Sequence, residues 1–260
     1  MKLRAALCVA ALSLIAGCAT EQTSSEFKPD VNTTGDESDA RSRARIHTEL
    51  ASGYYELGNL GVALEEVSEA LRADSTYGPA YNVSALIHAE LKEDRLAEQQ
   101  FERALRLNPV DSDANNNYGS FLCQRKREEE GIRHFLAALR NPLYQTPDRS
   151  YVNAGLCSRR RGDLAGAEDY FQKALKVRPN QPQALYQLAD MFYARGEYGP
   201  ARQYSLRVNQ MGPSPEALWL ALRVERKLGD RNAEASYAAQ LKRSFPESRE
   251  ARALAAGQYE

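Results

Sequence analysis

Residues 96–109 read LAEQQFERALRLNP, and this stretch decides the fold of the chain. Within it Ala97, Phe101 and Ala104 follow one another at spacings of four and three residues, so they share one face of a helix. Pro109 then ends the helix, because proline cannot continue the helical hydrogen-bond pattern. Two small residues on either side of an aromatic ring predict a helix that packs closely against a partner.

The same helix face recurs along the chain with a near-constant period. The equivalent residues are Ala63, Val67 and Ala70; Gly131, Phe135 and Ala138; Ala167, Phe171 and Ala174; Ala201, Ser205 and Val208; and Glu234, Ala238 and Leu241. A period of 34 residues with this second-helix pattern is typical of the tetratricopeptide repeat, a helix-turn-helix unit. The sequence therefore predicts an all-α fold, a right-handed superhelical solenoid of six tetratricopeptide repeats.

The repeat boundaries follow from the period and from the Pro and Gly residues between units. We expect repeats over residues 44–77, 78–111, 112–147, 148–181, 182–214 and 215–247. The third repeat is two residues longer because of the link 141–147, NPLYQTP. Residues 248–260 are expected to form a C-terminal capping helix, since repeat arrays need a covered end.

The N-terminal segment predicts export and lipidation. Residues 1–17 combine a short basic start with an apolar run too short to span a bilayer, as in a signal peptide. The run ends in Ile15-Ala16-Gly17-Cys18, which resembles the bacterial lipobox and makes Cys18 the predicted site of acylation, for example by palmitate. The alternative is an ordinary secretory signal with a coincidental cysteine. Ala19 favours the outer membrane, where a lipid anchor on Cys18 would hold the protein at the periplasmic face.

Residues 18–43 are predicted to be a flexible lipidated tether. They are rich in Ser, Thr, Asp and Glu and contain few apolar residues, so they cannot bury enough surface to offset the entropy of ordering.

Composition argues against several classes of function. The net charge of −1 becomes about −3 once Lys2 and Arg4 leave with the signal peptide, which gives no field suited to nucleic acid. His47, His88 and His134 lie at packing positions of different helices and predict no metal site. No phosphate-binding loop and no nucleophile–base–acid set can be argued. We therefore expect no enzyme activity, no cofactor and no small-molecule substrate.

Cys123 and Cys157 form a candidate disulfide. Both lie in first helices of adjacent repeats, and the exported compartment is oxidising. Their positions within the repeat differ by two residues, about 200° around a helix, so one can face forward and the other back. The alternative is a pair of buried free thiols.

The concave surface of the solenoid is the candidate partner site. In stacked repeats the second, fifth, ninth and twelfth residues of each first helix are expected to line it. In the first three repeats the candidate groove residues are Thr48, Ser52, Tyr55, Asn82, Leu86, Ala89, Asn116 and Ser120. The competing C-terminal groove carries Trp219, Arg223 and Arg226, which would demand an acidic partner. The N-terminal groove is favoured because its apolar residues suit an amphipathic helix or an extended peptide.

Three segments resemble one family in particular. The lipobox, the third-repeat sequence NNYGSFLC at residues 116–123 and the stretch NPLYQTPDRSYVN at residues 141–153 are similar to the type IV pilus biogenesis lipoproteins of the PilF/PilW family, as is QLKR at residues 240–243. The resemblance implies an outer-membrane pilotin that binds the pilus secretin and supports its localisation and multimerisation. It implies no catalytic residue. A repeat lipoprotein that regulates a periplasmic cell-wall enzyme is the alternative. Glu234 departs from the usual Ala, so the sixth repeat is expected to pack loosely.

Overall fold

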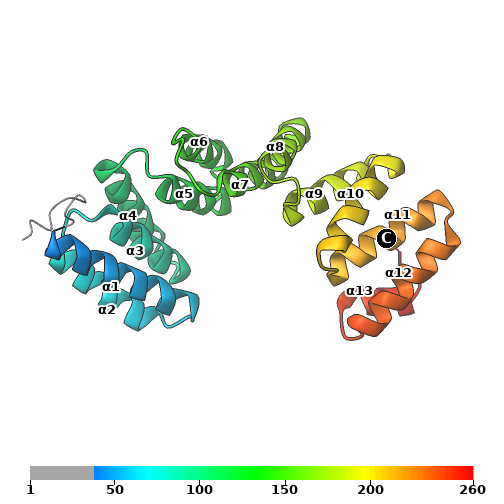
Figure 1. Ribbon diagram of the computed structural model, residues 1–260, viewed down its shortest axis with the longest axis horizontal. Helices are drawn as coiled ribbons and strands as arrows, with labels where there is room; N and C mark the ends of the chain where they lie inside the picture. Colours follow the sequence, from blue (N-terminus) through cyan, green and yellow to red (C-terminus); the bar gives the residue numbers. More distant parts are fainter. Residues whose placement is uncertain (1–37, 260) are drawn as a thin grey trace, which may run out of the picture. The chain divides into compact units, whose positions relative to one another are not determined.

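The computed structural model describes residues 38–259, which contain thirteen helices and no strand. The helices are α1 (Asp39–Glu56), α2 (Leu60–Ala73), α3 (Gly78–Glu90), α4 (Asp94–Leu107), α5 (Ser112–Gln124), α6 (Glu128–Ala138), α7 (Pro147–Arg160), α8 (Leu164–Val177), α9 (Pro182–Ala194), α10 (Tyr198–Met211), α11 (Pro215–Leu228), α12 (Arg231–Ser244) and α13 (Arg249–Ala255). Figure 1 shows them as successive antiparallel pairs. The predicted all-α repeat solenoid is confirmed.

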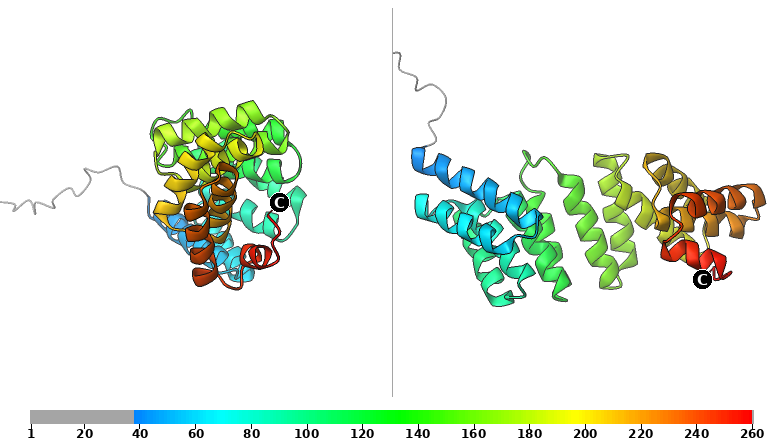
Figure 2. Two further views of the ribbon diagram at one scale, coloured as in Figure 1. Left: turned by 90° about the vertical axis from the view of Figure 1, so that its right-hand side faces the viewer. Right: turned by 90° about the horizontal axis from the view of Figure 1, so that it is seen from below.

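Each repeat is one helix pair that packs against its neighbours. The tightest contacts join the two helices of a pair, from α1 with α2 to α11 with α12. Weaker contacts join the second helix of one repeat to the first helix of the next, and several first helices also touch one another, as α3 does α5. Figure 2 shows the same pairing from two other directions. Within residues 38–259 no helix is both long enough and apolar enough to cross a membrane.

The first helix begins earlier than the sequence pattern suggests. Residues 39–43 belong to α1, so the predicted tether over residues 18–43 extends too far at its C-terminal end. The helix starts here because the Ser38 side chain accepts a hydrogen bond from the Arg41 backbone N–H and Asp39 lies in the positively polarised first turn. The signal peptide at residues 1–17 and the lipidation site at Cys18 lie outside the described residues.

The second helices bury the residues that define the repeat. The central phenylalanines Phe101, Phe135 and Phe171 are fully buried. In repeats three and four, glycines make room for these rings: a Cβ atom on Gly155 would lie 2.6 Å from Cε1 of Phe171. A Cβ atom on Gly131 would lie 2.7 Å from the Gly119 carbonyl oxygen. The helices of these two repeats therefore approach closely because their sequence lacks side chains at the contact points.

The sixth repeat packs less tightly, as its departure at Glu234 predicts. Leu241 is the one buried residue of its second helix, α12, whereas the second helices α8 and α10 each bury three. The predicted C-terminal cap is present as α13, and Ala251 and Leu254 on it pack against Leu218 and Leu222. The cap thus covers the apolar face that the last repeat would otherwise expose.

Candidate functional site

The fifth position of the first helices lies in the seam between repeats and not on an open groove. Thr48, Asn82 and Asn116 are buried, which corrects the prediction that they line a partner-binding surface. Asn117 Nδ2 donates a hydrogen bond to Asn82 Oδ1 at 3.2 Å. Asn153 Nδ2 donates to Asn116 Oδ1 at 3.0 Å. The first helix of the following repeat covers this position, and the buried amides find partners across the seam.

The ninth and twelfth positions do line a shallow groove. Tyr55, Leu86, Ala89 and Ser120 border a pocket of about 120 Å³ formed by the first three repeats. Ser52 is half-buried and its hydroxyl donates to the Thr48 carbonyl. Burial raises the pKa of the Tyr55 hydroxyl, and the nearby charge of Glu90 adds to this effect. The groove is small and its rim is polar, so it offers a narrow contact for a partner.

A second surface of the first repeat is absent from the sequence-based list. Ile46, Leu50 and Leu57 are 48%, 45% and 80% exposed, although all three are large and apolar. With Gly53 and Tyr54 they border a hollow of about 460 Å³ on α1. These residues form one helix face, which we call the α1 stripe. The spacing of four and seven residues between Ile46, Leu50 and Leu57 is the sequence signal for this face, and the same spacing is typical of a helix face that packs into a core.

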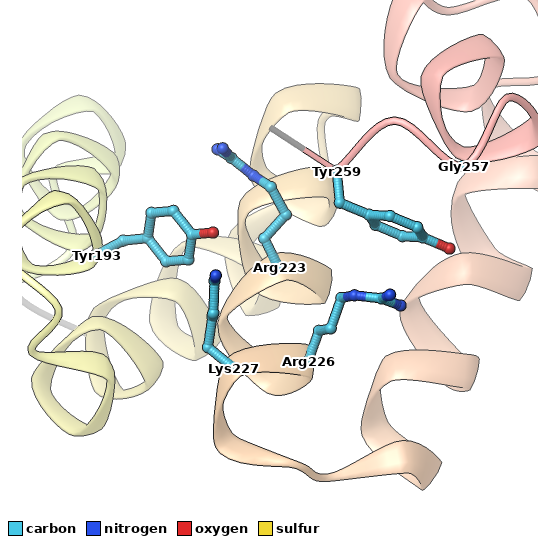
Figure 3. Close-up of a pocket in the computed structure, with 6 residues that line it drawn as sticks. All are labelled: Tyr193, Arg223, Arg226, Lys227, Gly257 and Tyr259. Carbon is cyan, nitrogen blue, oxygen red and sulfur yellow. The ribbon is translucent and has the colours of Figure 1, made fainter.

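The C-terminal repeats form a basic pocket. Tyr193, Arg223, Arg226, Lys227 and Tyr259 border a volume of about 430 Å³ (Figure 3). In Figure 3 the Arg223 and Lys227 side chains extend toward the side where the Tyr193 ring lies, and the Arg226 guanidinium lies at the Tyr259 ring. Two aromatic rings and three cations therefore line one pocket beside α11.

The cations of this pocket differ in how they are paired. The Arg226 Nη1 lies 2.8 Å from Glu234 Oε1, and its guanidinium carbon lies 3.8 Å from the centre of the Tyr259 ring. The Arg223 guanidinium lies 4.8 Å from the Tyr193 ring and 5.9 Å from the Trp219 ring. Within residues 38–259 neither Arg223 nor Lys227 makes an ion pair, so their charges are available to a ligand.

Cys123 on α5 and Cys157 on α7 form a disulfide, with their Cα atoms 5.9 Å apart. The bridge crosses from the third repeat to the fourth and is surrounded by Ile132, Phe135 and Ala154. Arg160 Nη1 donates a hydrogen bond to the Cys123 carbonyl at 3.0 Å. The two repeats are thus joined by a covalent bond as well as by packing.

The three histidines lie apart, each with its own neighbour. His47 Nδ1 lies 2.6 Å from Glu66 Oε2, and His88 Nδ1 lies 2.6 Å from Glu93 Oε2. His134 Nδ1 lies 3.0 Å from Asn115 Oδ1. In the part of the chain that the structure describes, no group of three histidine, cysteine, aspartate or glutamate side chains is arranged to hold a metal ion.

Comparison with known proteins identifies the relatives of this chain. Tetratricopeptide-repeat profiles match residues 95–146 and 158–214, and a further one matches residues 78–111. The type IV pilus assembly protein PilF of Pseudomonas aeruginosa is 33% identical over 252 residues, which cover 96% of this chain and 97% of that protein. The chain belongs to the PilF family of type IV pilus assembly proteins. This confirms the resemblance drawn from the lipobox and the third repeat.

Two solved structures of the family share the fold. The structure of Pseudomonas aeruginosa PilF superposes with a TM-score of 0.75 at 32% identity and covers 85% of this chain and all of that chain. The structure of PilW, described as a widely conserved type IV pilus biogenesis factor, gives a TM-score of 0.71 at 32% identity and covers 81% of this chain and 97% of that one. Tetratricopeptide scaffolds of this kind mediate contacts between proteins. Within residues 38–259 the shallow groove, the α1 stripe and the basic pocket are three exposed surfaces of this PilF-family chain.

Proposed function

We propose that this protein is a pilotin, a non-enzymatic lipoprotein adaptor of the outer membrane that binds the type IV pilus secretin and supports its localisation and multimerisation. Membership of the PilF family supports a role in pilus assembly. The lipobox that ends in Cys18 supports anchoring at the periplasmic face of the outer membrane.

The α1 stripe is the observation that carries the proposal. Ile46, Leu50 and Leu57 leave a continuous apolar helix face in solvent at the first repeat. A face of this kind costs solvation free energy unless a partner covers it, and it suits the apolar side of an amphipathic helix. Only residues 19–37 separate this repeat from Cys18 in the sequence, so the anchor is connected directly to the repeat that carries the stripe. A secretin segment bound there would be held close to the membrane.

The binding surface is tested by charged substitutions on the stripe. Leu50→Glu combined with Leu57→Glu should abolish secretin capture and the formation of secretin multimers in the outer membrane, because each carboxylate would be desolvated against the partner. Leu143→Glu is the matched control, since Leu143 is 77% exposed on the link before α7 and should be neutral. Circular dichroism of the variants should match the parent. Secretin multimers are measured by immunoblotting of unheated membrane samples.

The shallow groove provides the competing surface. If Tyr55→Ala with Leu86→Asp eliminates multimers while the stripe variant retains them, the partner binds the groove. If deletion of the whole protein leaves the multimers intact, the pilotin role is wrong.

The anchor has a separate test. Cys18→Ala should give a folded protein that is lost from the outer-membrane fraction, because one residue carries the lipid and the repeats fold without it. Retention of this variant in the outer membrane after fractionation would reject lipid anchoring.

A further inference from the structure

The basic pocket continues into a second pocket on the other side of Arg223. The second one has a volume of about 570 Å³ and is bordered by Trp219, Arg249 and Arg252 among others. Arg223 lines both. Among residues 38–259 the two pockets are bordered by five cationic side chains, Arg223, Arg226, Lys227, Arg249 and Arg252, and by one carboxylate, Glu250. This end of a chain whose net charge is slightly negative therefore concentrates positive charge on one surface.

The Arg223 side chain lies between two aromatic rings, but its buried Nε–H group has no hydrogen-bond acceptor within residues 38–259. The rings of Tyr193 and Trp219 flank its guanidinium, which restricts its rotamers before any ligand arrives. Its Nε is buried and has no hydrogen-bond partner within residues 38–259. A guanidinium presents its N–H groups as a planar fork that matches a carboxylate, and a buried unpaired donor costs free energy until such a group binds.

The remaining side chains form the wall and the outer part of the site. Arg226 is already paired with Glu234, and Tyr259 stacks on Trp219 with ring centres 5.8 Å apart. Arg226 and Tyr259 therefore build a rigid wall, whereas Lys227 is exposed and supplies a second unpaired cation beside Arg223. Because Arg223 joins two pockets, a single small anion would occupy only part of the site.

We propose that these adjoining pockets bind an extended acidic peptide segment of a partner protein. One carboxylate would pair with Arg223 and Lys227, a second with Arg249 and Arg252, and an apolar side chain between them would lie on the Trp219 ring. Charge complementarity and the paired pockets favour this ligand over a phosphate ion or a lipid surface. The proposal goes beyond the secretin adaptor role and uses repeats five and six, not the first repeat.

A synthetic peptide provides the first test. The acetylated and amidated peptide Glu-Glu-Phe-Asp-Glu should bind the purified full-length protein in isothermal titration, about tenfold or more tightly than Gln-Gln-Phe-Asn-Gln. Trp219 is the single tryptophan of the chain, so its fluorescence should change during the same titration. Raising the salt concentration should weaken the acidic peptide selectively. Equal affinity of the two peptides, or no binding of either, would overturn the proposal.

Variants locate the site. Arg223→Gln should weaken the acidic peptide about tenfold or more, and Lys227→Gln should weaken it severalfold. Lys242→Gln, an exposed lysine of α12 outside both pockets, is the matched control and should bind like the parent. Lys227 is exposed, so its variant tests the site even if Arg223→Gln disturbs local packing. Unchanged affinity in Lys227→Gln would overturn the assignment.

Two competitors separate the peptide from other anions. Inorganic phosphate and phosphatidylglycerol vesicles should displace the acidic peptide only weakly, because neither spans both pockets. Displacement by either at concentrations comparable to the peptide would show a general anion or lipid site and reject the peptide proposal.

Discussion

Repeats three and four each contain close glycine contacts and a buried phenylalanine ring and are joined by a disulfide, whereas the first repeat presents the α1 stripe and the sixth contributes the cations of the basic pocket. The same helix-turn-helix unit thus serves two purposes in one chain. In the centre, close packing holds the two helices of each repeat together and the disulfide joins the two repeats, whereas the ends present the α1 stripe and the basic pocket. The difference shows that repeats built on the same helix-turn-helix pattern can present different surfaces.

One equivalent position shows the contrast directly. The first signature residue is Gly131 in the third repeat and Glu234 in the sixth. Gly131 lets α6 approach the α5 backbone so closely that a Cβ atom would overlap it. Glu234 instead turns its carboxylate to Arg226 at the edge of the basic pocket. A packing position in the centre has become part of an ion pair beside the basic pocket at the end.

Removing the disulfide should cause the largest loss of stability in the central repeats. Cys123→Ser with Cys157→Ser releases a crosslink between residues 34 apart in sequence. The chain-entropy model gives a loss of about 4 kcal/mol in the free energy of unfolding, measured by urea denaturation. The helical signal should persist, because neighbouring repeats still bury their seams.

Hydrogen exchange provides the control for that variant. Amides of α5 to α8 should exchange faster without the bridge, while those of α11 to α13 should change little. Equal acceleration in both regions would show that the centre and the end unfold as one unit and do not differ in local stability.

The regular part of the fold could be predicted from the sequence because its signals are local. The starts of α3, α5, α9 and α11 at Gly78, Ser112, Pro182 and Pro215 agree with the predicted repeat boundaries, and α7 starts one residue early. The start of α1 was missed because residues 39–43 are polar and lack the repeat pattern. There the cap at Ser38 provides the start signal, and capping is a feature of one residue and not of a period.

The sites were harder to predict because they depend on how helices rotate against one another. Asn82 and Asn116 have the sequence spacing of groove residues, but the next first helix covers them. Leu50 has the spacing of a core residue, but no earlier helix within the described residues covers it. Tyr259 reaches the basic pocket only because α13 folds back onto α11. Contacts of this kind depend on tertiary packing, which no local pattern specifies.

Adding one methyl group to a glycine should change stability in opposite directions in the third repeat and in the first repeat. Gly131→Ala should lower the free energy of unfolding by about 1–3 kcal/mol, because the new Cβ would lie 2.7 Å from the Gly119 carbonyl oxygen. Gly53→Ala, in the middle of α1 with no atom within 4 Å of the new Cβ, should raise it by about 0.5–1 kcal/mol. Both are measured by urea denaturation. Effects of the same sign would show that helix propensity, and not contact distance, determines the outcome.

The smallest expected change in stability comes from protonation of His134 in the third repeat as the pH falls. His134 on α6 lies beside Asn115 and 4.5 Å from the centre of the Tyr118 ring. Burial lowers the pKa of His134 below its ordinary value of about 6.5, and the charge of Arg133 adds to this effect. The unfolded chain therefore binds a proton at this residue more readily than the folded chain. As the pH falls below about 6.5, stability should decrease by at most about 1.4 kcal/mol per pH unit from this one group.

His134→Gln isolates this contribution, because glutamine keeps a hydrogen-bond donor toward Asn115 and does not titrate. Thermal melts of the parent and the variant between pH 7.5 and pH 5 should diverge, with the parent losing more stability at the acidic end. Residues 215–259 contain no histidine, so hydrogen exchange in α11 to α13 should depend on pH alike in the two proteins once intrinsic rates are corrected. Parallel melting curves would show that His134 takes up its proton equally well in the folded centre, and that this seam is more open to water than its packing implies.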